Sequence, residues 1–441
     1  MNATRESWRL AWPLILSNLS VPLLGVVDTA VVGHLDSPRY LGGVALGALV
    51  MSVFYWMFGF LRMGTTALTA QAFGAGDWNE TRAALGRAML VAAGLGLVIV
   101  LVGPVVLVLA ERLFAPTPDV AVEFEHYLAI RLFGAPAALA SMVVLGWFLG
   151  LQDSRRPLLL MIATNGINAV LAVLLVFGLG LATPGVASAT VLAEYAGLGL
   201  GLWLLRGNWR RQGGWPGWGV LMVPDRFHRL LAVNRDLFLR SLMLEAAFLT
   251  FAAIGSRQGE VVLAANAVLM NFFTAAAYGL DGFAHAAEAM VGRAVGARDR
   301  AGFRAAVHAA FVNAALLALV MTVAFAAFGG WGVRLMTGLP EVRAQAAAFL
   351  PYIVVVPLVS VWAFVLDGIY LGATRTAELR NGMAVSLALF GVAVLALVPP
   401  LGNHGLWLAL LALLAGRALV LAVIYRRIER RAPFVPVARP A

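Results

Sequence analysis

Long apolar runs alternate along the chain with short polar connections. A helix that spans a membrane needs roughly 20 mostly apolar residues. The runs lack charge over most of their length and contain interior Gly and Pro, which favours helices over barrel strands. We therefore predict an all-α integral membrane protein. Its helices are expected near residues 10–35, 44–72, 86–110, 125–150, 158–180, 185–206, 230–256, 262–292, 303–328, 345–372, 380–400 and 403–426, about twelve in all.

Composition and charge support this class. Hydrophobic residues make up 61% of the chain and charged residues 12%, so lipid must cover much of the surface. The formal charge of +10 comes from arginines that gather in alternate connections, such as 206–235 and 426–431. This is the positive-inside pattern, which places both termini and the long middle connection in the cytoplasm. It argues against a nucleic-acid partner.

The second feature is an internal duplication. Gly74-Ala75-Gly76-Asp77 returns as Gly296-Ala297-Arg298-Asp299, and Gly146-x-x-x-Gly150 returns as Gly368-x-x-x-Gly372. The offset is close to half of the 441 residues. Because each half holds six predicted helices, both halves cross the membrane in the same direction, related by a two-fold axis along the membrane normal. We predict two pseudo-symmetric six-helix bundles.

The polar and aromatic stretch in the middle of the chain sets the predicted domains. We expect an N-terminal lobe over 1–206, a cytoplasmic linker over 207–229, a C-terminal lobe over 230–426 and a tail over 427–441. No phosphate-binding loop is present, so uphill transport would require an ion gradient. The chain has no cysteine, which excludes disulfides and thiolate metal sites. The first apolar segment has no cleavage signal and is expected to stay as a helix.

Asp28 is the clearest candidate for chemistry. It lies deep in the first apolar segment, after Pro13 and Pro22, which can bend the helix. A charged side chain at that depth is unfavourable, so Asp28 is a candidate to gain and lose a proton. The alternative is an aspartate that a polar neighbour neutralises permanently.

Two corresponding helices carry polar stripes. Arg62, Thr65 or Thr66, and Thr69 follow one face of the second segment, and Asp281, His285 and Glu288 follow one face of the eighth. Both stripes are expected to face a hydrated central cavity. A metal site at the second stripe is a weak alternative, and we predict none. Arg62 could equally be a structural counter-ion.

Other polar residues lie inside apolar segments. Each could form a helix-helix hydrogen bond only, or take part in a polar cavity. They are Asn165, Asn168, Thr190 and Glu194 in the first half, and Glu245 and Asp367 in the second.

At these residues the whole chain resembles the multidrug and toxic compound extrusion (MATE) family, in particular its DinF-like branch. The most specific matches are the segments 27–35, 60–71, 278–282 and 366–368. The resemblance implies two six-helix lobes around a V-shaped central cavity. It also implies an antiporter, not an enzyme, that exports amphipathic, often cationic compounds against H⁺ or Na⁺.

The resemblance also implies roles for single residues. Asp28 matches the first-helix aspartate of cation coupling, Pro13 matches a preceding proline, and Asn168 and Thr190 match positions around an N-lobe cation site. Ala172 departs from the pattern, because the family has an aspartate there. Since Na⁺ depends on oxygen ligands, this favours H⁺. Glu245 and Asp367 resemble a C-lobe acidic pair, so coupling through that lobe stays open.

We therefore expect a monomeric, proton-coupled multidrug exporter in the bacterial inner membrane that works by alternating access. Its partners would be the lipid bilayer and small cationic or amphipathic compounds, without a bound cofactor. A flippase for a lipid-linked precursor is the first alternative, but it would need a strongly basic cavity. An intramembrane enzyme is the second, and only the stripe of Asp281, His285 and Glu288 approaches its requirements.

Overall fold

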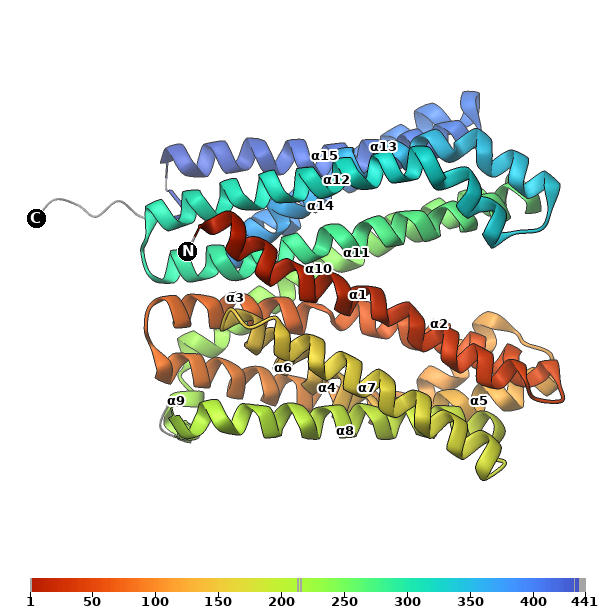
Figure 1. The fold of residues 1–441 in the computed structure, drawn as a ribbon, viewed down its shortest axis with the longest axis horizontal. Helices are drawn as coiled ribbons and strands as arrows, with labels where there is room; N and C mark the ends of the chain where they lie inside the picture. The colour runs from red at the N-terminus through yellow and green to blue at the C-terminus, as the bar shows by residue number, and fades with distance from the viewer. Residues whose placement is uncertain (1, 212–213, 215, 432, 436–441) are drawn as a thin grey trace, which may run out of the picture. The chain divides into compact units, whose positions relative to one another are not determined.

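The computed structural model describes residues 2–211, 214, 216–431 and 433–435, with the backbone alone for 21–24, 26 and 208–211. Within these residues the chain is helical and holds no strand (Figure 1). The helices are α1 (Ala3–Gly33), α2 (Pro38–Phe58), α3 (Phe60–Gly74), α4 (Trp78–Phe114), α5 (Pro118–Leu132), α6 (Ala135–Gly150), α7 (Arg155–Val173), the π-helix η1 (Leu174–Gly178), α8 (Ala182–Arg211), α9 (Trp218–Leu221), α10 (Pro224–Ser256), α11 (Glu260–Gly296), α12 (Arg300–Met336), α13 (Pro340–Gly372), α14 (Thr376–Leu401) and α15 (Asn403–Arg431).

Ten spans of the described chain are long and apolar enough to cross a membrane, and a bent pair of helices gives an eleventh. The helix α1 adds 31 residues, which exceeds the roughly 20 that a span requires. The predicted class, an all-α membrane protein of about twelve spans, is confirmed.

The helices form two compact units. One comprises residues 16–73 and 77–231, and we call it the N-unit. The other comprises residues 1–15, 74–76 and 232–441, and we call it the C-unit. The helix α1 therefore contributes its first part to the C-unit and its remainder to the N-unit.

Two predicted segments are interrupted. The segment expected over 125–150 consists of α5 and α6, which are bent by 48° at the break. Pro136 lies in the first turn of α6 and has no N–H to bond to the preceding turn, so the helix bends there. The segment expected over 44–72 is broken between α2 and α3 at Gly59. Neither break interrupts the apolar pattern.

The duplicated glycines make matching contacts in the two units. A side chain at Gly146 would collide with the backbone carbonyl of Arg62, and one at Gly368 would collide with that of Ala284. Both contacts bring two helix backbones together, α6 against α3 and α13 against α11. The repeat in the sequence is therefore a repeat of close helix packing.

The duplicated aspartates also have one role in both copies. Asp77 accepts a hydrogen bond from the N–H of Glu80 at the start of α4, with an O···N distance of 2.9 Å. Asp299 accepts one from the N–H of Gly302 at the start of α12, also at 2.9 Å. Each aspartate satisfies an N–H group that the first helical turn leaves without a partner.

Gly368→Ala is expected to destabilise the protein by about 1–3 kcal/mol, because the added methyl must push α13 away from α11. Thermal unfolding in detergent measures the effect. The matched control is Gly391→Ala in α14, where an added methyl meets nothing within 4 Å. The control should be neutral or slightly stabilising, because Ala favours helix. Equal unfolding temperatures for the two variants would contradict the packing role of Gly368.

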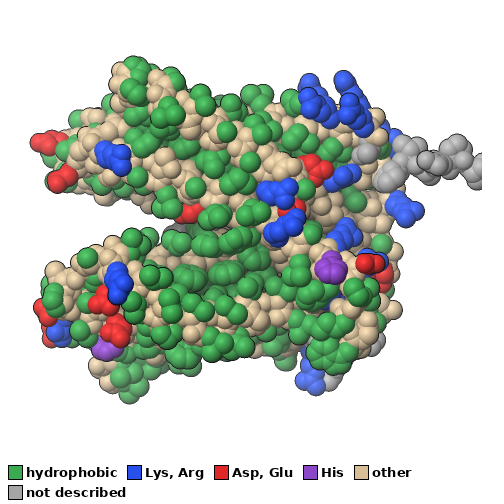
Figure 2. Space-filling view, turned by 180° about the vertical axis from the view of Figure 1, so that it is seen from behind, with side chains coloured by type: hydrophobic (Ala, Val, Ile, Leu, Met, Phe, Trp, Pro, Cys, Tyr) green, Lys and Arg blue, Asp and Glu red, His purple; other side chains and the backbone are tan. Residues whose placement is uncertain are grey.

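The surface agrees with a lipid environment. Large apolar side chains stand exposed on the long helices, among them Leu101, Leu109, Val392 and Leu395. In Figure 2, hydrophobic side chains cover the middle of the visible face, and most of the basic side chains gather towards one end. This separation is typical of a helix bundle that crosses a bilayer.

Candidate functional site

Asp28 lies inside the N-unit with only 7% of its surface exposed. It belongs to the later part of α1, and the amide Nδ2 of Asn168 on α7 is 3.5 Å from its Oδ1. Within the described chain, no arginine or histidine lies within ion-pair distance of its carboxylate. Asp28 is therefore a buried acid whose one recorded hydrogen-bond partner is a neutral amide.

Asn168 connects Asp28 to α8. It is fully buried, and its Nδ2 is also 3.4 Å from the hydroxyl oxygen of Thr190. The Oδ1 of Asn168 has no hydrogen-bond partner among the described atoms. Ala172 lies one helical turn further along α7, fully buried, and supplies no oxygen ligand. The structure thus brings together three of the predicted residues, Asp28, Asn168 and Thr190, of which only Asp28 carries a carboxylate.

Glu194 belongs to a neighbouring polar cluster of the N-unit. Its Oε1 accepts a hydrogen bond from the Tyr55 hydroxyl at 2.9 Å and an ionic one from Arg131 at 3.0 Å. Arg131 in turn donates to the Tyr55 hydroxyl at 3.0 Å. These three residues, which we call the Arg131 triad, join α2, α5 and α8.

Arg131 relates the triad to Asp28. Tyr127, on the same helix, packs in one buried cluster with Val27 and Val31 of α1, on either side of Asp28. Tyr127 and Arg131 are one turn apart on α5 and only 3% and 4% exposed. Asp28 and the triad therefore form one continuous polar region inside a membrane-spanning bundle.

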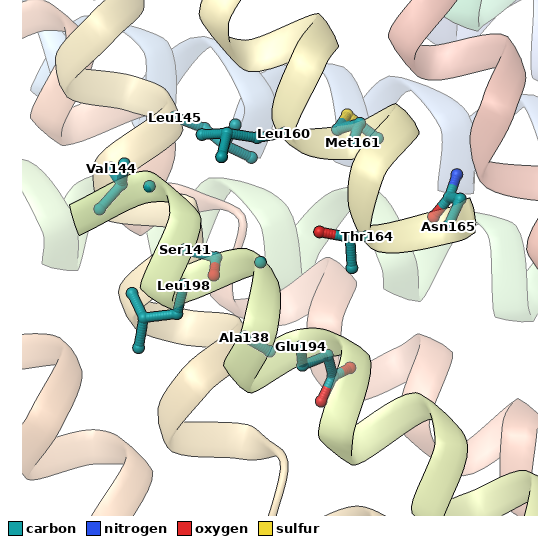
Figure 3. Close-up of a pocket in the computed structure, with 12 residues that line it drawn as sticks. Ala138, Ser141, Val144, Leu145, Leu160, Met161, Thr164, Asn165, Glu194 and Leu198 are labelled. Atoms are coloured by element: carbon teal, nitrogen blue, oxygen red, sulfur yellow. The ribbon is translucent and has the colours of Figure 1, made fainter. Parts of the chain in front are cut away.

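A cavity of about 140 Å³ adjoins this region between α6, α7 and α8 (Figure 3). Its wall is mostly apolar, including Leu145, Leu160 and Met161, with Asn165 and Glu194 among its few polar residues. Asn165 also donates from its Nδ2 to the backbone carbonyl of Ser20 at 3.2 Å, which ties α7 to α1. An apolar pocket with a few polar groups is the usual form of a small-molecule site.

Asp367 has a different environment in the C-unit. Its Oδ2 pairs with Arg240 on α10 and with Arg417 on α15, the latter at 2.6 Å. All three residues are buried. Glu245 lies half-buried on α10, and neither an ion pair nor a hydrogen bond joins it to Asp367 in the described chain.

The second polar stripe is mostly internal to the C-unit. Glu288 is fully buried and His285 is 5% exposed, with 3.7 Å between His285 Nδ1 and Glu288 Oε2. Asp281 is half-buried on the same helix. No group of three His, Asp or Glu side chains in the described part of the chain has the arrangement of a metal site.

The remaining predicted residues lie near helix contacts. Thr65 and Thr66 donate to backbone carbonyls one turn earlier in α3, at 2.6 and 2.9 Å, and Arg62 supplies the second carbonyl. Pro13 lies within α1, in the part that belongs to the C-unit. The side chain of Pro22 lies outside the described residues, so its role in bending stays a prediction.

Sequence reasoning missed the partners of the acids. Tyr55, Arg131, Arg240 and Arg417 were not singled out, although each lies within or at the edge of a predicted apolar segment. The usable signal was the arginine itself, because a guanidinium within a spanning helix requires an acidic partner. The pattern along one helix does not identify that partner, which lies on a distant segment.

These features define a class: a polytopic helical membrane protein with buried polar sites. The MatE family model matches the chain twice, over residues 13–174 and 237–397, once in each half. The chain is 44% identical over 434 residues to DNA damage-inducible protein F of Escherichia coli (strain K12), covering 97% of this chain and 93% of that one. It belongs to the MatE family of efflux transporters, as the resemblance predicted.

Two further comparisons agree. The chain is 31% identical to the probable multidrug resistance protein NorM of Caulobacter vibrioides, covering 69% of this chain and 66% of that one. A crystal structure of a MATE protein in the bent conformation superimposes with a TM-score of 0.86 at 20% identity, covering 98% of this chain and 96% of that one. At that identity the structural match concerns the fold alone.

Proposed function

We propose that this protein is a secondary antiporter that exports amphipathic, mainly cationic organic compounds in exchange for H⁺, with Asp28 as the carboxylate that binds the proton. Transport follows alternating access, and the coupling ion is the only cofactor-like species in the proposal. The protein works as a monomer in the bacterial inner membrane, with both termini in the cytoplasm, as its arginine distribution supports.

The observation that carries the proposal is the environment of Asp28. The residue is 7% exposed, and its recorded hydrogen-bond partner is the amide of Asn168. An ionised carboxylate without a paired cation is unfavourable inside a membrane bundle. Protonation removes that charge. Proton binding therefore favours a conformation that shields Asp28 from water, and that conformation in turn favours proton binding.

The ligand set supports H⁺ over Na⁺. A hard cation is usually held by several oxygen atoms, including carboxylates. Near Asp28 the other oxygens belong to the neutral side chains of Asn168 and Thr190, and Ala172 contributes none. A proton requires only the one carboxylate.

The C-unit is a weaker candidate for coupling. Asp367 already has two arginine partners, which offset its negative charge. Glu245 is half-buried and has no ion pair within the described residues. The multidrug substrate range rests on the similarity to NorM, whose name describes probable multidrug resistance.

The deciding experiment is efflux of a fluorescent organic cation from proteoliposomes, with a pH gradient or a Na⁺ gradient applied alone. We expect the pH gradient to drive efflux and the Na⁺ gradient to leave it at the level of protein-free liposomes. An inert gradient of K⁺ is the control for osmotic effects. Efflux with the Na⁺ gradient alone would contradict the choice of ion, and no efflux under either gradient would contradict antiport.

A further inference from the structure

We propose that Asp28, Arg131 and Glu194 act as one proton-binding cluster, in which two carboxylates share one guanidinium. Arg131 and Glu194 are positioning residues that set the pH at which Asp28 exchanges its proton. This inference rests on the proposed function and adds two residues to its coupling site.

The first support is the burial of the triad. Arg131 is 4% exposed, so its charge is shielded from water and needs a partner within the protein. Glu194 is the partner in this structure, at 3.0 Å. Tyr55 donates to the same oxygen, which keeps the carboxylate in position.

The second support is that the triad has unused bonding capacity. The Nε of Arg131 and the Oε2 of Glu194 are buried and have no hydrogen-bond partner among the described atoms. An ion pair whose only role was to hold two helices together would be expected to use both carboxylate oxygens, as the fork geometry of arginine allows. The free donor lets Arg131 move towards a second acceptor without losing all of its bonds.

Asp28 is the second acceptor. Its neighbour Asn168 contacts Thr190, which lies one turn from Glu194 on α8. Tyr127, one turn from Arg131 on α5, packs in one buried cluster with Val27 and Val31 of α1. The titratable and charged groups of this region are Tyr127 and Arg131 on α5, with Tyr55 on α2 and Glu194 on α8 bonded to Arg131. The neighbours on α7 and α8, Asn168 and Thr190, carry no charge.

The net charge of the three residues indicates that the cluster binds one proton. With both acids ionised and Arg131 charged, the cluster carries one net negative charge. One proton makes it neutral, which a membrane interior favours. When Asp28 loses its proton, Arg131 is the nearby cation that stabilises it, while Tyr55 continues to hold Glu194. A change at α1 is thereby transmitted to the contacts between α5 and α8.

The test is the pH dependence of dye efflux in proteoliposomes. Glu194→Gln leaves Arg131 with Asp28 as its one acidic partner, so Asp28 stays ionised and the pH of half-maximal efflux falls. Arg131→Gln removes the cation, so that pH rises. Each shift is expected to be about one pH unit or more. The double variant should return towards the wild-type midpoint, and Arg131→Lys should stay near it because the charge is kept.

The matched control is the ion pair of Arg39 and Glu123, which joins α2 and α5 of the same unit at 3.7 Å. Removing either charge there should leave the pH midpoint unchanged. Slower efflux in Glu194→Gln and Arg131→Gln with an unmoved midpoint would overturn the inference, because a merely structural pair would act in that way. The proposed function would still stand if wild-type efflux followed the pH gradient.

Folding of the variants must be checked by size-exclusion chromatography in detergent. If Arg131→Gln does not fold, Glu194→Gln alone decides: a lower midpoint supports the inference and an unchanged midpoint overturns it. Wild-type protein without any pH-driven efflux would overturn both this inference and the proposed function.

Discussion

Replacing Asp28 by Asn is expected to abolish efflux driven by a pH gradient, down to the level of liposomes without protein. Asparagine has nearly the shape of aspartic acid but cannot release a proton. It therefore keeps the site permanently neutral. The side-chain oxygen of residue 28 is still available to Asn168 Nδ2, which lies 3.5 Å from Asp28 Oδ1. Without a charged state, the proton gradient has no differential affinity to act upon, so it cannot drive the conformational change.

The control for this variant is Asp36→Asn, which removes an exposed aspartate just beyond the end of α1. It should transport at the wild-type rate. Binding of the cationic dye to Asp28→Asn, measured by fluorescence polarisation, should weaken, because in an antiporter the neutral, proton-bound state of the site is the one that releases the substrate. Proton-driven efflux that survives in Asp28→Asn would place the coupling group elsewhere in the protein.

The helical class and the repeat could be predicted because both follow from local patterns in the sequence. An apolar run of spanning length has one stable backbone conformation in lipid. The matching glycines at 146 and 368 are visible because only a residue without a side chain tolerates the backbone contacts that both make. Such constraints act on single positions, so the residue type at each position reveals them in the sequence.

The bends of the helices were harder to predict from the sequence. Pro136 lies two residues after Gly134, yet the apolar run over 125–150 is continuous and predicts a single spanning segment. In the structure a side chain at Gly134 would collide with Glu194 of α8. The bend and the absent side chain together bring Glu194 close to Arg131, an effect of tertiary packing that one segment cannot reveal.

The polar site was predicted in part. Asp28, Asn168 and Thr190 lie together as the family resemblance implied, since their spacing places each on a helix that faces the others. Arg131 was missed because its partner Glu194 lies 63 positions further along the chain. The pairing of Asp367 with Arg240 and Arg417 was missed for the same reason. Sequence shows that a buried charge needs a partner, and packing decides which one it obtains.

The second large effect is expected at Asp367. Asp367→Asn removes the acid between Arg240 and Arg417 and leaves two buried guanidinium groups facing each other. Breaking a buried ion pair by removing one partner destabilises a protein by ~3–5 kcal/mol. We expect a much lower unfolding temperature in detergent, measured by intrinsic fluorescence.

Glu245→Gln is the matched control, because Glu245 is an acid of the same unit that is half-buried and has no ion pair within the described residues. Its stability should change by roughly 0.5 kcal/mol or less. Replacing Asp367, Arg240 and Arg417 together by Leu, Met and Met should recover most of the loss, since apolar residues of similar volume often replace a buried ion cluster without penalty. If Asp367→Asn instead kept the wild-type unfolding temperature and lost proton-driven efflux, Asp367 would be a coupling residue. The C-unit would then take part in proton exchange, and Asp28 could not be the only carboxylate that drives transport.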